Sequence, residues 1–251
     1  MSRAHRFFLT ETRLVLNERI DLAEILHQLQ TVLRLEVGAH IVLLDGEGRA
    51  FLTELVSLTR KAAIGHVLSE LPAPAEPIAQ ITLYQCTLKA DKFEWVLQKG
   101  AELGVSRFVP VISQRSIVRP AAVVVKKYER WQAILREAAE QCERGRIPTL
   151  APPLDWSAAV QHPQGLRLFA WEEQRSAAVS VRQALGNGTQ RVRPDNQISL
   201  LIGPEGGITD EEATEARLAG WQTISLGPRI LRAETAALTS IVLTMTHLNQ
   251  L

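Results

Sequence analysis

Short apolar runs alternate with polar turns over the first 70 residues of the chain. The runs are Ile41–Leu44, Ala50–Val56 and Ile64–Leu68. The segments between them, Asp45–Gly48 and Thr59–Lys61, have the composition of hairpin turns. Residues 22–33 instead carry apolar side chains at helical spacing. The pattern therefore predicts a small β-barrel with one helix over residues 1–70.

The Pro-rich segment 71–77, Leu-Pro-Ala-Pro-Ala-Glu-Pro, is typical of a linker. After it, apolar runs of strand length alternate with longer stretches of helical spacing. Residues 78–251 are therefore expected to form an α/β domain, with a parallel sheet covered on both faces. The expected strands are Ile78–Thr87, Arg107–Ile112, Leu166–Trp171, Ile198–Ile202 and Gln222–Leu226. The expected helices are Asp91–Leu103, Lys126–Glu143, Gln174–Leu185, Asp210–Leu218 and Glu234–His247.

Local signals mark the ends of some of these helices. Thr209 and Asp91 each stand three residues before a glutamate, Glu212 and Glu94 respectively, so both pairs are expected to form capping boxes. Gly104 is expected to end the first helix. The last helix combines apolar residues at helical spacing with small residues that allow close approach. We therefore expect it to be buried against the sheet or against a partner subunit.

Two loops rich in Gly and Pro lie in the last fifth of the chain, and each connects an expected strand with an expected helix. The first is Gly203-Pro-Glu-Gly-Gly207, and the second is Leu226-Gly-Pro-Arg-Ile-Leu-Arg-Ala233. Open α/β sheets bind ligands at the carboxyl ends of their strands, where such loops lie. Two loops so close in sequence predict one pocket built from both. For the first loop, an ordinary turn that uses glycine for its geometry is the alternative.

The charges beside the first loop limit the kinds of ligand that it could bind. Asp210, Glu211 and Glu212 occupy the first turn of the next helix, where they complement the helix dipole and would repel a polyphosphate. The chain also lacks GxxxxGK[ST] and GxGxxG, so a Rossmann-type nucleotide enzyme is disfavoured. A neutral or cationic ligand fits this loop better.

The second loop carries Arg229 and Arg232 directly before the apolar last helix. Arginines that enter a buried helix need anionic partners or a substrate. One interpretation pairs Arg232 with Glu234 or Glu205. The other, which we favour, gives Arg232 the role of orienting a substrate or stabilising developing negative charge.

The composition is that of a globular protein: 46% of the 251 residues are hydrophobic and 22% are charged. No segment is apolar for long enough to span a membrane, and the N-terminus lacks the apolar core of a secretory signal. The two cysteines, Cys86 and Cys142, suit a reducing cytoplasm without a disulfide. They are too few for a structural zinc site, so no metal is expected.

The formal net charge of +1 hides a basic middle segment. Residues 78–150 contain 12 Lys and Arg against 7 Asp and Glu, whereas the parts on either side each have a net charge of −2. The basic residues of interest are Lys89, Lys92, Arg115, Arg119, Lys126 and Lys127. This segment is the best candidate for contact with phosphate, as in recognition of a local RNA site, although a solvated face of mixed charge explains part of it.

The two Gly-rich loops, within Leu201–Gly207 and Leu226–Ala236, closely resemble those of the ribosomal RNA small subunit methyltransferase E family. Further blocks of likeness, in order, are His5–Phe8, Val32–Leu35, Lys89–Lys92, Gln98–Val105, Glu137–Cys142 and Arg146–Pro148. The departures are Gly100, where the family favours a helix former, and Ala233, where Thr is common. Members of this family are SPOUT-class enzymes that use S-adenosylmethionine to methylate N3 of a uridine in 16S rRNA.

The resemblance implies a PUA-like RNA-binding barrel followed by a SPOUT-type α/β domain whose C-terminal segment is threaded into a trefoil knot. It also implies a homodimer that acts on small-subunit rRNA or the assembled subunit. The residues it places at the S-adenosylmethionine cofactor are Trp171, Glu172, Ile202, Gly203, Pro204, Glu205, Gly206, Gly207, Leu226, Gly227, Ile230, Leu231, Arg232 and Ala233. The expected RNA contacts are His5, Arg6, Arg34, Lys89, Lys92, Arg115 and Arg229.

The segment His5–Phe8 combines aromatic rings with a cation, as base-stacking surfaces do. As an N-terminal strand with alternating sides, it would bury only one of Phe7 and Phe8. With the resemblance, we expect Arg6 to contact RNA and at least one of the two phenylalanines to lie in the core.

Methylation at N3 sets one chemical requirement, because the uridine must lose its N3 proton. No histidine lies in the C-terminal loops. Arg232 is therefore expected to stabilise charge on the uracil oxygens, while Glu205 or Glu234 accepts the proton directly or through water. Two other functions stay open: a non-catalytic RNA-binding ribosome assembly factor, and a SPOUT methyltransferase that acts on another RNA base.

Overall fold

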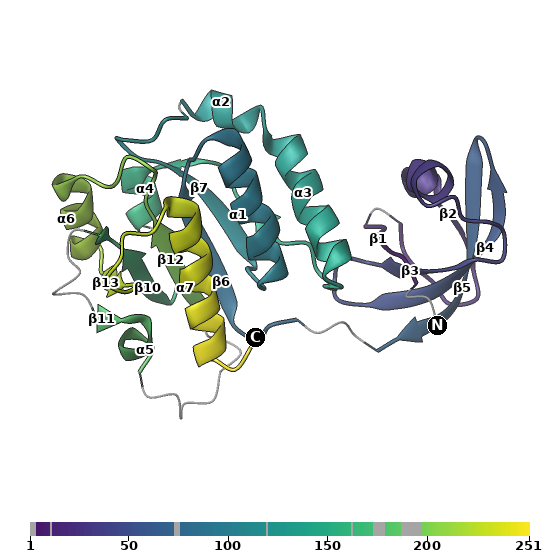
Figure 1. The fold of residues 1–251 in the computed structure, drawn as a ribbon. Helices are drawn as coiled ribbons and strands as arrows, with labels where there is room; N and C mark the ends of the chain where they lie inside the picture. The colour runs from purple at the N-terminus through teal and green to yellow at the C-terminus, as the bar shows by residue number, and fades with distance from the viewer. Residues whose placement is uncertain are drawn as a thin grey trace. The chain divides into compact units, whose positions relative to one another are not determined.

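The fold is seen in a computed structural model, and residues 4–10, 12–72, 76–118, 120–161, 163–172, 179–186 and 197–251 are described. The chain divides into two compact units (Figure 1). The first unit is Met1–Glu76 with Ala139–Ile147, and the second is Pro77–Ala138 with Pro148–Leu251. The first boundary falls within the expected linker 71–77, of which 73–75 lie outside the described residues. The assignment of 139–147 to the first unit was not predicted.

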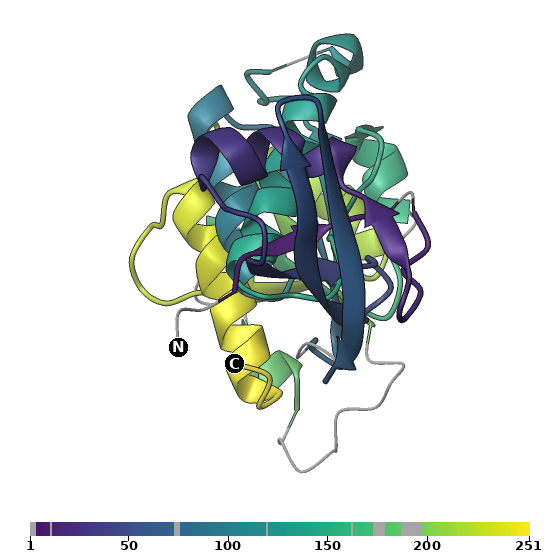
Figure 2. The same cartoon turned by 90° about the vertical axis from the view of Figure 1, so that its right-hand side faces the viewer.

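The first unit is built on a five-stranded sheet with the order β1-β3-β4-β5-β2. Its strands are β1 (Arg6–Phe8), β2 (Arg19–Asp21), β3 (His40–Leu44), β4 (Ala50–Thr59) and β5 (Ala62–Leu71). β1 pairs parallel to β3 and the other pairs are antiparallel. The two predicted hairpins are confirmed, and β4 and β5 form the long ribbon seen in Figure 2. The expected helix at 22–33 is confirmed as a continuous helical segment over residues 23–32, which begins as the tight turn η1 (Ala23–Ile25) and ends as the wide turn η2 (Gln28–Val32).

Both phenylalanines of β1 are buried, which confirms the expectation that at least one lies in the core, whereas simple alternation would have buried only one. Phe7 is 6% exposed and Phe8 is fully buried. The two side chains do point to opposite sides, as alternation requires, but each side has its own core. Phe7 packs in a cluster with Leu29 and Phe51, whereas Phe8 packs in a second cluster that includes Ala139. The second cluster exists because a segment distant in sequence covers that face.

A buried ion pair fixes the segment 139–147 within the first unit. The Arg144 guanidinium is 7% exposed and its Nη2 donates to Oε2 of Glu76 at 2.8 Å. Oε1 of Glu76 also accepts from the backbone amides of Gly145 at 2.9 Å and Arg146 at 3.2 Å. The Glu76 carboxylate thus receives donors from three successive residues, which explains why this return of the chain belongs to the unit.

The second unit contains a parallel sheet with the order β11-β13-β10-β12-β6-β7-β8, and β9 pairs with β7. All strand pairs of this sheet within the described ranges are parallel, as predicted. The strands are β6 (Gln80–Cys86), β7 (Arg107–Ile112), β8 (Thr149–Leu150), β9 (Leu154–Asp155), β10 (Leu166–Ala170), β11 (Val179–Ser180), β12 (Gln197–Ile202) and β13 (Gln222–Ser225). The helices are α1 (Ala90–Glu102), α2 (Ala121–Val125), α3 (Tyr128–Gln141), α4 (Trp156–Gln161), α5 (Val181–Ala184), α6 (Asp210–Leu218) and α7 (Ala233–His247).

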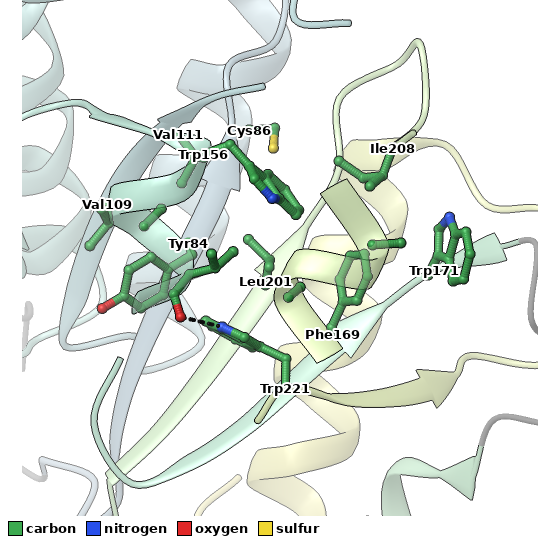
Figure 3. Packing of buried hydrophobic residues seen from close by; sticks show 14 of the residues in the cluster. Tyr84, Cys86, Val109, Val111, Trp156, Phe169, Trp171, Leu201, Ile208 and Trp221 are labelled. Atoms are coloured by element: carbon green, nitrogen blue, oxygen red, sulfur yellow. Dashed lines mark hydrogen bonds between the residues drawn. The ribbon is translucent and has the colours of Figure 1, made fainter. Parts of the chain in front are cut away.

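Helices cover both faces of this sheet. On one face α4 and α6 pack over an aromatic cluster that includes Tyr84, Phe169 and Trp221 (Figure 3). The other face carries α1 and α7, which lie side by side (Figure 1). Gly100 of α1 has a local reason: a Cβ there would lie 2.8 Å from the Phe108 ring of β7. The close approach of α1 to the sheet therefore requires glycine where a helix former would be expected from propensity.

The capping box expected at Asp91 is wrong. The helix α1 begins at Ala90 after Lys89, so Asp91 lies inside the first turn, where its side chain is not the cap. Glu94 instead accepts two hydrogen bonds from Arg130 of α3, at 2.8 and 2.7 Å. Gly104, with φ of +90°, follows the end of α1 as predicted.

At α6 the capping box of Thr209 and Glu212 is confirmed. The short elements α2, α4, β8, β9 and β11 were not predicted. The helix expected at Gln174–Leu185 is wrong at Val179–Ser180, which form β11, and is confirmed only as α5; residues 174–178 lie outside the described part of the chain.

Candidate functional site

A pocket of about 390 Å³, partly open to solvent, lies where β10 and β13 end and α7 begins. Its walls are mostly apolar. The lining residues are Ala170, Trp171, Glu172, Ile224, Ser225, Leu226, Gly227, Arg229, Ile230, Leu231 and Ala236. Because β10 and β13 are parallel neighbours, their carboxyl ends come together and their loops form one site, as in other open α/β sheets.

The pocket is formed by the second Gly-rich loop and by the segment after β10. Of the residues expected at the cofactor, those that line it are Trp171, Glu172, Leu226, Gly227, Ile230 and Leu231. Arg229, expected to contact RNA, lines it as well. Sequence analysis missed Ala170, Ile224, Ser225 and Ala236. Ile224 and Ser225 end an expected strand, so the rule that ligands bind at strand ends was the available signal.

Trp171 is the polar group most deeply placed in this wall. Its side chain is only 5% exposed, and its Nε1 is buried without a hydrogen-bond partner. The guanidinium of Arg217, from α6, lies 5.4 Å from the centre of the Trp171 ring, which holds the indole in place. A buried N–H without an acceptor is costly, and a ligand acceptor in the pocket would satisfy it.

The first Gly-rich loop, Gly203–Gly207, does not line this pocket but packs beside it. Gly207 has φ of +76°, and a Cβ there would lie 2.8 Å from Oε1 of Glu172, which is a pocket residue. A Cβ on Gly206 would lie 3.0 Å from Arg115, whose Nη1 donates to the Gly206 carbonyl at 3.4 Å. The glycines therefore allow this loop to approach both neighbours closely.

Gln85, at the end of β6, was missed by sequence analysis. It is 1% exposed, and its Nε2 donates to the carbonyls of Cys86 and Gly203, at 3.1 and 3.3 Å. Its Oε1 is buried without a partner. Gln85 thus fixes the start of the first Gly-rich loop, and a glutamine in an apolar strand was the signal that could have identified it.

Three charged side chains from distant segments meet beside the first loop. Nζ of Lys92, on α1, lies 3.3 Å from Oε1 of Glu205 and 3.5 Å from Oε1 of Glu234, on α7. The backbone amide of Lys89 also donates to Oε1 of Glu205, at 3.4 Å. The side chains of Lys92, Glu205 and Glu234 are 28%, 19% and 13% exposed. Glu205 and Glu234, both expected in catalysis, are thus brought together by Lys92, which was expected to bind RNA.

Arg232 does not take the place that one interpretation gave it. It is exposed, precedes α7 as its N-terminal cap residue, and makes no ion pair among the described residues. Lys92, rather than Arg232, pairs with Glu205 and Glu234. The interpretation that Arg232 is neutralised by these glutamates is therefore wrong.

The other expected RNA contacts differ in how exposed they are. His5, Arg34, Lys89, Arg115 and Arg229 are exposed, whereas Arg6 is partly buried. Nη2 of Arg6 forms an ion pair with Glu143 at 3.2 Å, within the first unit, so its charge already has a partner. Arg119 lies outside the described residues.

Among the described side chains, the Cys86 thiol and possible metal ligands are two further groups to consider. Burial raises the pKa of the Cys86 thiol well above its usual range, so this cysteine stays protonated and is not a nucleophile. Within the described ranges, no group of three His, Cys, Asp or Glu is placed to hold a metal ion. Nor is any helix in those ranges long and apolar enough to cross a bilayer.

Comparison with known proteins matches both units to families. Residues 74–245 match the RNA methyltransferase domain, and residues 24–68 match the RNA methyltransferase PUA domain. The chain is 36% identical to the ribosomal RNA small subunit methyltransferase E of Synechocystis, over 84% of this chain and 67% of the relative. It is 30% identical to the same enzyme of Bacillus subtilis, over 93% of each chain.

Two solved structures share the fold. A ribosomal RNA small subunit methyltransferase E from Neisseria gonorrhoeae, bound to S-adenosylmethionine, has a TM-score of 0.85 at 35% identity, over 97% of this chain and 98% of that one. A methyltransferase structure from Legionella pneumophila, also with bound S-adenosylmethionine, has a TM-score of 0.87 at 30% identity with the same coverage. The α/β fold with a PUA-like N-terminal domain is therefore confirmed. These matches place the chain in the ribosomal RNA small subunit methyltransferase E family.

Proposed function

We propose that this protein transfers a methyl group from S-adenosylmethionine to N3 of a uridine in the 16S rRNA of the small ribosomal subunit. The main support is the pocket at the ends of β10 and β13, which the second Gly-rich loop helps to form, together with two similar structures, covering nearly the whole chain, whose proteins are bound to S-adenosylmethionine. The pocket suits this molecule because its walls are apolar and the indole N–H of Trp171 lacks an acceptor.

The charges near the pocket also suit a cationic ligand. Glu172 lines the pocket, and Glu205 and Glu234 lie on segments that flank it. Bound S-adenosylmethionine supplies a methyl group on a positively charged sulfur. Carboxylates nearby favour binding of such a cation and would disfavour the phosphates of NAD or ATP.

This chain's residues have two tasks in the reaction. Glu205 or Glu234 takes the N3 proton of the uridine, directly or through a water, and the nitrogen lone pair becomes available for the new bond to the methyl carbon. The bond between that carbon and the sulfonium sulfur would break in the same transfer, with its electron pair retained by sulfur as a neutral thioether. Arg232 is exposed and without an ion-pair partner among the described residues, so we assign it to the uracil oxygens, where negative charge develops. Arg229 and Arg115 are further candidates for that role.

The test of the cofactor is calorimetric titration with S-adenosylmethionine and, separately, with NAD and ATP. Selective binding of S-adenosylmethionine supports the proposal. A folded protein, free of copurified cofactor, that binds none of the three would leave the RNA-binding assembly factor as the better interpretation.

The test of the reaction is methylation of 16S rRNA, followed by mapping of the modified nucleotide. Free rRNA and assembled small subunits should be compared as substrates. We expect a single N3-methyluridine in wild-type reactions, and a methylated base of another kind would contradict the assignment. Arg232→Ala should keep cofactor binding and lose methylation, and full activity in this variant would remove Arg232 from the mechanism.

We propose that RNA is held by the first unit together with basic residues of the second. Support comes from the PUA match and from the exposed side chains of His5, Arg34 and Lys89. Arg6 is a weaker candidate because it is paired with Glu143. Removing one phosphate contact should weaken binding to all sequences alike and reduce the salt dependence, which filter-binding assays at several salt concentrations measure.

We further propose a cytoplasmic homodimer with a knotted C-terminal segment. The dimer is supported by apolar side chains exposed on the neighbouring helices α1 and α7, where Trp95 is 43% and Leu243 is 42% exposed. The knot is supported by the family resemblance and by the return of the chain from β13 to α7, which packs against β12 and β6. Sedimentation of the wild type and of Leu243→Glu tests the dimer, because a monomeric wild type would contradict it.

A further inference from the structure

The Lys92 ammonium joins two carboxylates that the proposed function uses. Glu205 comes from the first Gly-rich loop and Glu234 from the first turn of α7, and each presents its Oε1 to Nζ of Lys92. We propose that Lys92 is a positioning residue, which holds Glu205 and Glu234 so that their second oxygens face the N–H groups of the substrate and cofactor. The inference rests on the proposed function and departs from the expectation that Lys92 contacts RNA.

The cluster of Lys92, Glu205 and Glu234 is connected to the pocket at two points. Glu234 stands two residues before Ala236, which lines the pocket. Glu205 stands two residues before Gly207, whose Cα is packed against the Glu172 carboxylate in the pocket wall. The ammonium of Lys92 therefore ties together the two segments that border the ligand site.

The second carboxylate oxygen, Oε2, of each glutamate lacks a hydrogen-bond partner. Oε2 of Glu205 and Oε2 of Glu234 are both buried and have no hydrogen-bond partner. The corresponding Oε1 atoms are held, that of Glu205 by both Lys92 and the Lys89 amide. Buried carboxylate oxygens without donors are rare because desolvation is not repaid. Donors from bound molecules, such as the N3–H of uridine or the amino group of the cofactor, would complete them.

A further buried polar atom without a hydrogen-bond partner lies near the first Gly-rich loop and supports this interpretation. Oε1 of Gln85 is buried without a partner, and the residue is 99% buried while its Nε2 holds the Gly203 carbonyl. Together with Nε1 of Trp171, unpartnered polar atoms therefore occur both near the first Gly-rich loop and in the pocket wall. Such a concentration is typical of a site that a ligand completes.

Phosphate binding by Lys92 is the competing role. Its ammonium already faces two carboxylates and is only 28% exposed, so the cluster carries a net charge of −1. A phosphate would meet these carboxylates together with the ammonium, and repulsion would oppose it. The exposed neighbour Lys89, whose side chain forms no ion pair with the described residues, fits a phosphate contact better.

The experiment compares Lys92→Met, Lys92→Gln and Lys92→Arg with the matched control Lys99→Met. Lys99 lies on the same helix and also forms an ion pair, with Glu102 at 2.7 Å, at 35% exposure. For each full-length variant we would measure kcat, KM for rRNA, Kd for S-adenosylmethionine, and the salt dependence of RNA binding. Thermal unfolding and circular dichroism establish that each variant is folded.

We expect Lys92→Met and Lys92→Gln to lower kcat at least tenfold with KM for rRNA changed less than threefold. Lys92→Arg should recover most of the activity because its guanidinium can still bridge two carboxylates. Lys99→Met should match the wild type. If Lys92→Met does not fold, the split between kcat and KM in Lys92→Gln and the recovery in Lys92→Arg decide the question.

Two results would overturn the inference. An unchanged kcat with a raised KM, and a salt slope reduced by about one unit, would show that Lys92 contacts phosphate. Equal, small effects in Lys92→Met and Lys99→Met would show that the ion pairs are only structural. Failure of the proposed function is distinguished by the wild type: a wild-type protein that does not methylate rRNA rejects both, whereas an active wild type isolates the role of Lys92.

Discussion

Gly207→Ala should weaken the binding of S-adenosylmethionine, and Gly186→Ala is the matched control for the effect of the substitution on the backbone. Gly207 and Gly186 have nearly the same backbone conformation, with φ of +76° and +79°. An alanine in this left-handed region costs roughly 1–2 kcal/mol at either position. The surroundings differ, because a Cβ at 186 would meet no atom of the described residues within 4 Å, whereas a Cβ at 207 would lie 2.8 Å from Oε1 of Glu172.

The backbone cost should therefore appear in both variants, and displacement of Glu172 only in one. For a chain of this size, 1 kcal/mol lowers the melting temperature by about 2–4 °C. We expect a loss of this order in both Gly207→Ala and Gly186→Ala, with no change in S-adenosylmethionine affinity for Gly186→Ala. Gly207→Ala should bind it at least tenfold more weakly, since Glu172 lines the pocket.

Differential scanning calorimetry and isothermal titration of the same preparations give the two quantities. The ratio of the two dissociation constants removes the contribution of backbone strain, because both variants carry it. If Gly207→Ala binds S-adenosylmethionine as tightly as Gly186→Ala does, contact between the first loop and Glu172 plays no part in ligand binding. The interpretation of Gly207 as a link between the two loops would then be wrong.

Three further predictions concern the two ion pairs and the buried cysteine. Arg144→Met should destabilise the first unit by about 3–5 kcal/mol in urea unfolding, because it leaves the Glu76 carboxylate without its buried partner. Arg130→Met removes a pair with Glu94 whose arginine is 72% exposed, so the loss in the same assay should be much smaller than that of Arg144→Met, and equal losses in the two variants would contradict this difference in burial. Cys86 should resist iodoacetamide at neutral pH until the protein unfolds, because burial raises its pKa, and mass spectrometry of the alkylated peptides would detect any native reaction.

Local signals in the sequence were sufficient for much of the second unit. The order of strands and helices follows from apolar runs and their spacing, because each run is set by its own burial. Where a pattern is completed within four residues, as in the Thr209–Glu212 box, the prediction is confirmed. The same pattern at Asp91–Glu94 failed because α1 begins earlier, at Ala90 after Lys89, so Asp91 does not occupy the cap position. Glu94 instead pairs with Arg130, 36 residues away.

The first unit shows the same limit at larger scale. Alternation along β1 correctly placed Phe7 and Phe8 on opposite sides, but it could not reveal that both sides are covered. The cover over Phe8 includes Ala139, and the Phe8 amide donates to Glu140 at 2.8 Å. Both residues lie more than 130 positions away in sequence. Burial on the second side depends on tertiary packing that periodicity does not encode.

Closeness in sequence suggested that Arg232 pairs with Glu234 or Glu205, and the structure shows why this interpretation is wrong. Arg232 stands two residues before Glu234, and side chains two apart at a helix start do not face each other. The helix α1 packs beside α7 and brings Lys92 to Glu234 from 142 positions earlier in the sequence. Arg232 is thereby left exposed, without an ion pair in the described part of the chain. Because Lys92 already pairs with Glu205 and Glu234, these carboxylates do not need Arg232 as a further partner. The packing of α1 beside α7, which brings Lys92 to the carboxylates, therefore leaves Arg232 available for the anionic uracil of the proposed reaction.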